Sequence, residues 1–134
     1  MSVYAIECAG LLKIGYSTDP DRRVAALFQS GSRYSAPRAA YEARGTQRLV
    51  AVIDKATKQD ERAIHWALDD YSIGCEWFLD EPEVRELLAS FTLGDQPEPI
   101  GRDGGPAWEA TPPGDRGGAN VGLAVSVLAK RAAS

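Results

Sequence analysis

Glu61 and His65 are the residues of this sequence whose types and spacing are best suited to chemistry. They stand four positions apart in a segment with helical periodicity, beside the apolar stripe of Ile64 and Leu68, and so share one face of the predicted helix. Carboxylates and imidazoles bind metal ions and transfer protons in catalysis. The pair is therefore a candidate functional site. The alternative interpretation is that His65 is a hydrogen-bonded structural histidine and that Glu61 stabilises the helix through its dipole.

Basic residues are concentrated in the first part of the chain. Residues 1–53 contain seven lysines and arginines against four acidic residues, whereas residues 54–93 contain four against ten. Six of the early bases are arginine, whose guanidinium group suits bidentate contact with phosphate. The whole chain has a formal net charge of −4. This charge argues against an indiscriminately basic nucleic-acid-binding protein but is compatible with one basic face.

Several other classes of protein do not fit the sequence. Cys8 and Cys75 are too few for a disulfide scaffold, and with one histidine the chain cannot assemble a zinc site of the Cys/His kind. It also has no GxGxxG or Walker pattern for a nucleotide cofactor. The amino terminus lacks the features of a signal peptide, and the longest apolar stretch, residues 121–129, is shorter than the roughly 20 residues of a membrane span. We therefore expect a cytoplasmic protein with no membrane segment.

Three short apolar segments predict β-strands at residues 3–7, 11–16 and 48–53, and a glycine-containing connection joins the first two as a hairpin. Residues 76–79 predict a further short extended segment, and residues 32–47 an irregular excursion.

Capped amphipathic segments predict helices near residues 20–29, 58–71 and 81–90, with Asp19, Thr57 and Asp80 as the capping residues. Together these elements predict an α+β domain with a small three-stranded antiparallel or mixed sheet flanked by helices.

The composition changes sharply after Leu93. Residues 94–118 are dense in glycine and proline and contain few large apolar side chains, so they predict disorder. Residues 121–131 predict a short helix, although an isolated helix of this length is marginal in water. The expected organisation is a domain over residues 1–93 and a Gly/Pro-rich disordered tail over residues 94–134.

Five pieces of sequence, in the same order and at similar spacing, resemble the GIY-YIG nuclease superfamily in its bacteriophage branch. They are Val3-Tyr4, Lys13-Ile14-Gly15, Arg23, the Glu61 and His65 pair, and Gly74-Cys75-Glu76-Trp77-Phe78. The resemblance covers about residues 2–88. It depends on all five pieces occurring together, because each piece alone is common. It implies a GIY-YIG-like fold for the predicted domain.

The resemblance implies a metal-dependent endonuclease that hydrolyses DNA phosphodiester bonds, with RNA left open as a partner. Tyr4 would activate the attacking water as base or by hydrogen bonding, Arg23 would neutralise charge on the phosphoryl oxygens, and Glu61 would hold one Mg²⁺ or Mn²⁺. Lys13 would orient the water or lower the pKa of a neighbouring tyrosine, and His65 would lie at the rim. We expect these residues to line one surface.

The sequence also departs from the pattern of the superfamily. Ser2 stands where a glycine precedes the first motif, and Leu27 stands where many active members carry histidine or tyrosine, with Tyr16 as a candidate substitute. The alternative function is therefore a catalytically inactive GIY-YIG-like module that binds nucleic acid or a protein partner. Glu61 favours catalysis, because a carboxylate beside phosphate repels it unless a cation lies between them.

Overall fold

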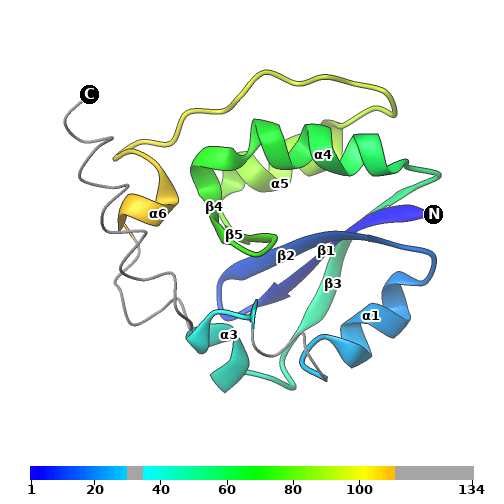
Figure 1. The fold of residues 1–134 in the computed structure, drawn as a ribbon, viewed down its shortest axis with the longest axis vertical. Helices are drawn as coiled ribbons and strands as arrows, with labels where there is room; N and C mark the ends of the chain where they lie inside the picture. Colours follow the sequence, from blue (N-terminus) through cyan, green and yellow to red (C-terminus); the bar gives the residue numbers. More distant parts are fainter. Residues whose placement is uncertain (30–34, 111–134) are drawn as a thin grey trace.

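Five antiparallel strands in the order β3-β1-β2-β5-β4 form the sheet of this protein (Figure 1). The computed structural model describes residues 1–29 and 35–110. The strands are β1 (Ser2–Cys8), β2 (Leu11–Ser17), β3 (Arg48–Asp54), β4 (Ser72–Gly74) and β5 (Trp77–Leu79). At the edge of the sheet β3 contains a bulge: Ala5 lies opposite Ala51 and Ile6 opposite Leu49, which leaves Val50 as an extra residue.

The α+β class is confirmed, but the predicted sheet of three strands was too small. The chain adds β4 and β5 as a hairpin, and β5 extends the sheet by pairing with residues 11–13 of β2. Strands of three residues are too short to show an alternating pattern. The turn residues Cys75 and Glu76 also lack the Asn-Gly type of signal that predicts a hairpin.

The three predicted capped segments form helices, and two further helices lie within residues 32–47 and 94–118, which the sequence predicted to be irregular and disordered. The helical elements are α1 (Pro20–Ala26), α3 (Arg38–Glu42), α4 (Lys58–Ala67), the 3₁₀ turn η1 (Asp69–Tyr71), α5 (Pro82–Ser90) and α6 (Ala107–Ala110). Asp19 caps α1, and Thr57 forms a capping box with Asp60 at the start of α4. Asp80 was the wrong cap for α5: Glu81 occupies that position, and Asp80 instead forms a two-pronged ion pair with Arg85. No helix among the described residues is long and apolar enough to cross a membrane.

Two hydrophobic cores lie on opposite faces of the sheet, and Figure 1 shows the helices that cover each face. The core beneath α4 and α5 contains Val3, Ile14 and Ile64. The core on the side of α1 and α3 contains Tyr4 and Leu27. The alternation of β1 side chains between these cores means that neighbouring residues of one strand serve different layers.

Residues 94–110, which the sequence places in the tail, contact the domain on both faces of the sheet. The Gly94 N–H donates to the Asp60 carboxylate and the Ile100 N–H to the Ala67 carbonyl, each at 2.9 Å, so this segment runs alongside α4 (Figure 1). Ile100 packs against the α4 and α5 core, and Ala107 is fully buried in the other. The boundary at residue 93 stays a prediction. The predicted helix at residues 121–131 lies outside the described residues.

Candidate functional site

The candidate residues gather around one edge of β2, at the point where its neighbour β5 ends. Among the described residues, strand pairing on this edge stops at Lys13. Beyond it, the Ile14 N–H donates to the Glu76 carbonyl at 3.0 Å, and the Ile14 carbonyl lies 2.8 Å from Nε2 of His65. The β4–β5 turn and α4 are thus both attached to the same residue of β2.

Glu61, His65 and Glu76 form what we call the Glu–His–Glu cluster. Each offers one ligand atom, and these three atoms all lie within 4.8 Å of one another. The helical spacing of α4 places Glu61 and His65 on one face, and the β4–β5 turn supplies Glu76. Glu61 is buried with 3% of its surface exposed, His65 is half-buried, and the Glu76 side chain is 41% exposed. The cluster therefore has a buried side and an accessible one.

Each carboxylate of the cluster is paired with a lysine. Nζ of Lys58 lies 2.7 Å from Glu61, and Nζ of Lys13 lies 3.0 Å from Glu76. Lys13 also donates to the Cys75 carbonyl at 3.1 Å. The hydrogen bond with Glu61 raises the pKa of Lys58, so this ammonium group stays protonated at neutral pH and compensates the buried negative charge.

The Tyr4 ring lies across Gly15, its partner on β2. A Cβ atom at Gly15 would lie 2.5 Å from the Tyr4 hydroxyl oxygen and 2.7 Å from Cζ, which explains why the third residue of Lys13-Ile14-Gly15 is a glycine. Burial raises the pKa of Tyr4, the positive charge of Arg23 opposes this rise, and the negative charges of Glu76 and Glu61 add to it. Tyr4 is therefore a neutral hydroxyl at pH 7.

The four residues expected on one surface come from both layers of the fold. Tyr4 belongs to the core on the side of α1, which carries Arg23, whereas Glu61 lies on α4, on the opposite face of the sheet (Figure 1). They approach one another around the edge of β2, and the charges of Arg23 and Glu61 both act on the Tyr4 hydroxyl. Arg23 itself is exposed, and its link to the others is this electrostatic one.

Leu27, which stands where many active members of the superfamily carry histidine or tyrosine, and its candidate substitute Tyr16 have different surroundings. Leu27 is 7% exposed and packs in the same core as Tyr4, so its side chain serves packing. The Tyr16 ring centroid lies 5.5 Å from Nζ of Lys58, the partner of Glu61. Of the two, Tyr16 is the one linked to the Glu–His–Glu cluster.

His65 makes the hydrogen bond that the structural alternative requires, and this bond also settles its chemistry. A carbonyl oxygen only accepts, so the nitrogen facing Ile14 carries the proton. In the neutral form of the ring, the other nitrogen, Nδ1, has a free lone pair and is able to bind a cation. The ring lies 5.1 Å from that of Phe78, which holds it from the side of β5.

Glu76 was missed as a site residue, although it lies within the quoted run of residues 74–78. The only indication in the sequence was its place within this run. Nothing in the local pattern predicts that Glu76 lies in a hairpin turn close to α4. Cys75 and Glu76 have φ values of 53° and 70°. A two-residue turn with positive φ at both positions is ordinarily made by Asn-Gly or similar pairs, so a glutamate here adopts an unfavourable backbone conformation.

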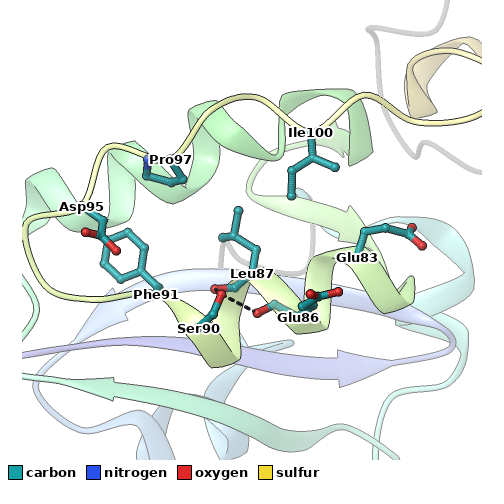
Figure 2. Close-up of a pocket in the computed structure, with 8 residues that line it drawn as sticks. All are labelled: Glu83, Glu86, Leu87, Ser90, Phe91, Asp95, Pro97 and Ile100. Atoms are coloured by element: carbon teal, nitrogen blue, oxygen red, sulfur yellow. Dashed lines mark hydrogen bonds between the residues drawn. The ribbon is translucent and has the colours of Figure 1, made fainter.

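A pocket of about 320 Å³ lies elsewhere, between α5 and the segment that follows it (Figure 2). Its lining includes Leu87, Phe91 and Ile100, and Ser90 donates a hydrogen bond to the Glu86 carbonyl at its border. None of the candidate site residues lines it. The candidate site is thus a group of side chains at a strand edge, separate from this pocket.

Comparison with known protein families matches residues 1–91 to the family described as the T5orf172 domain. The match spans the sheet and the helices α1, α3, α4 and α5, and it includes every residue of the candidate site. No curated protein and no solved structure gives a significant match to the chain.

Proposed function

This chain belongs to the T5orf172 domain family, and from its sequence resemblance to the GIY-YIG superfamily we propose that it is a metal-dependent endonuclease of the GIY-YIG type that hydrolyses DNA phosphodiester bonds. The observation that carries the proposal is the buried carboxylate of Glu61 beside His65 and Glu76, and the charges of both carboxylates also act on the Tyr4 hydroxyl. Lys58 already pairs with the Glu61 carboxylate, and the oxygen and nitrogen donors of Glu76 and His65 beside it suit a divalent ion. The residues therefore fit the metal that the reaction needs.

A divalent ion held at Glu61 would polarise the scissile phosphate and stabilise the leaving oxygen. The protein's own side chains would do the rest. The neutral hydroxyl of Tyr4 favours orienting the attacking water by a hydrogen bond over removing its proton, because its pKa is raised. The exposed guanidinium of Arg23 would contact the phosphoryl oxygens, and Lys13 would add positive charge beside Glu76.

The alternative is a module that binds nucleic acid or a protein partner without cutting. One observation favours it: Lys58 and Lys13 already neutralise Glu61 and Glu76. The juxtaposition of two carboxylates and an imidazole favours catalysis, since a module that only binds phosphate gains nothing from them.

The deciding experiment is a plasmid-nicking assay with Mg²⁺ or Mn²⁺, run beside a DNA-binding measurement and repeated on RNA. Glu61→Gln should abolish cleavage and leave DNA binding intact or tighter, because it keeps the shape and removes a negative charge. Glu42→Gln, an exposed carboxylate on α3, is the matched control and should behave as wild type. A wild-type protein that binds DNA and never nicks it would establish the binding module instead.

Arg23→Ala should weaken both binding and cleavage, because the contact with phosphate exists in the ground state and in the transition state. Arg22→Ala removes the same charge from the neighbouring exposed position and is the matched control. Binding that depends on a few arginines should also weaken as salt rises. Equal effects of the two substitutions would remove Arg23 from the site.

A further inference from the structure

We propose that Glu61, His65 and Glu76 form a three-ligand site selective for a divalent first-row transition ion such as Mn²⁺ over Mg²⁺, and that Lys58 is the resident cation this ion displaces. The proposal deepens the proposed function, because the ion would be the one used in hydrolysis. Its own argument comes from the contacts of the Glu–His–Glu cluster and needs no cleavage to test.

The spacing of the cluster suits one ion. Oxygen and nitrogen ligands bind such ions at about 2.0–2.2 Å, so two ligands of one ion lie at most about 4.4 Å apart. One donor atom from each of the three residues lies within 4.8 Å of the other two. A small side-chain adjustment would therefore complete the site.

The environment of His65 is that of a metal ligand. Histidines that bind metals ordinarily donate their other ring N–H to a carbonyl or carboxylate, which fixes the tautomer and the ring orientation. The Ile14 carbonyl has this role here at 2.8 Å from Nε2, and the Phe78 ring packs beside the imidazole. Both contacts come from the sheet, so the imidazole is oriented before any ion arrives.

The backbone at Glu76 is consistent with a functional demand on that position. Its φ of 70° follows the positive φ of Cys75, and asparagine or glycine would adopt this conformation at lower cost. Unfavourable backbone conformations concentrate at functional sites, where the side chain is needed more than the stability. A ligand at Glu76 accounts for a glutamate in a turn that does not favour it.

The donor set determines the kind of ion. Mg²⁺ prefers oxygen ligands and water, whereas an imidazole nitrogen suits transition ions. Two carboxylates with one imidazole therefore favour Mn²⁺ over Mg²⁺. Mn²⁺ is also a better probe than Zn²⁺ here, because the exposed thiol of Cys75 adjoins Glu76 and a thiolate attracts zinc.

Lys58 competes with the ion for Glu61. Its ammonium nitrogen lies 2.7 Å from the carboxylate, close to where a cation bound to that group must lie. The Lys58 side chain is 54% exposed, so it is able to swing into solvent when the ion binds. Binding of the ion must break the Lys58–Glu61 ion pair, and the ion and the Lys58 ammonium group repel each other. Both effects lower the affinity of the site for the ion.

The test measures Mn²⁺ binding to the full-length protein without DNA, by loss of the free Mn²⁺ signal in electron paramagnetic resonance, with Mg²⁺ as the competitor. Wild type should bind Mn²⁺ at least about tenfold more tightly than Mg²⁺. His65→Gln should lower the Mn²⁺ affinity by about tenfold or more and change the Mg²⁺ affinity little. Glu42→Gln is the control.

Two further variants keep the test independent of folding. Glu76→Asn should lower Mn²⁺ affinity while its melting temperature is unchanged or higher, because asparagine tolerates positive φ. Lys58→Met should bind Mn²⁺ several-fold more tightly, and Mn²⁺ should raise its melting temperature more than that of wild type. Lys55→Met, an exposed lysine outside the cluster, is the control for lost positive charge.

Equal affinity for Mn²⁺ and Mg²⁺, or unchanged Mn²⁺ affinity in both His65→Gln and Glu76→Asn, would overturn the three-ligand site. An unchanged Mn²⁺ affinity in Lys58→Met would overturn the displacement. Mn²⁺ binding with the expected losses in a protein that never nicks DNA would refute the proposed function and support this site. Cleavage that survives His65→Gln in Mg²⁺ would support the function while the binding data decide the ligands.

Discussion

Replacing Gly15 with alanine tests the position of the Tyr4 ring more directly than any change at Tyr4 itself. A Cβ at this position would lie 2.5 Å from the Tyr4 hydroxyl oxygen and 2.7 Å from Cζ. Ordinary contact begins near 3.4 Å, so the hydroxyl must retreat by about 0.9 Å. Tyr4 is only 4% exposed, which leaves its ring little room to move.

Two consequences follow from this displacement. Overpacking a buried position costs about 1–3 kcal/mol of unfolding free energy, which urea denaturation would measure. A catalytic group misplaced by about 1 Å loses up to about 100-fold in rate, so Gly15→Ala should nick DNA far more slowly than its stability loss explains. Gly101→Ala has open space around its new Cβ and no positive φ, and it should leave stability and cleavage unchanged.

A double-mutant cycle identifies the atom responsible. Tyr4→Phe removes the hydroxyl, so adding Gly15→Ala to it should slow cleavage little further if both changes act through that oxygen. Additive losses would mean that Gly15 acts elsewhere. Wild-type stability and cleavage in Gly15→Ala would refute the argument that the Tyr4 ring lies across this glycine.

Two further predictions concern stability. Hydrogen bonds to Asp60, one of them from the Gly94 N–H, outweigh the effect of burial and lower its pKa, so its contribution is present above the unfolded pKa near 3.9 and lost as pH falls below it. In Asp60→Asn the free energy of unfolding should therefore fall less steeply as the pH is lowered in the acid range. A fall as steep as that of wild type would contradict this. A chain that ends at Leu93 should lose about 2 kcal/mol or more of unfolding free energy, because it lacks the packed Ile100, and its melting temperature should be lower than that of the full chain. Equal melting temperatures would support the boundary at residue 93.

The sequence predicted those parts of the fold that local chemistry specifies. Asp19 and the Thr57 capping box determine where α1 and α4 begin, and both signals lie within four residues of the helix they start. The β1–β2 hairpin follows equally from a short connection between apolar runs. By contrast, the extended segment predicted at residues 76–79 joins the sheet as β5 because it pairs with β2, more than 60 positions away in sequence, and no local pattern contains the information on that pairing.

The same distinction applies to the site. Glu61 and His65 could be paired from helical spacing alone, whereas Glu76 required knowledge of how a hairpin turn meets α4. The expectation that Tyr4, Lys13, Arg23 and Glu61 line a single surface stays a prediction. Alternation along β1 sends Tyr4 to one layer while α4 covers the other, and only the end of β5 pairing at Lys13 lets the two sides approach each other.

The bulge in β3 has a consequence for how copies of this protein behave toward one another at high concentration. Residues 48–54 are rich in β-branched and apolar side chains, and Val52 at the sheet edge is 42% exposed. A straight strand of this composition would offer a template for intermolecular pairing and aggregation. The extra residue Val50 interrupts the regular alternation of that edge, as bulges do in proteins that resist such pairing. At the opposite edge, β4 has three residues, too few to recruit another chain.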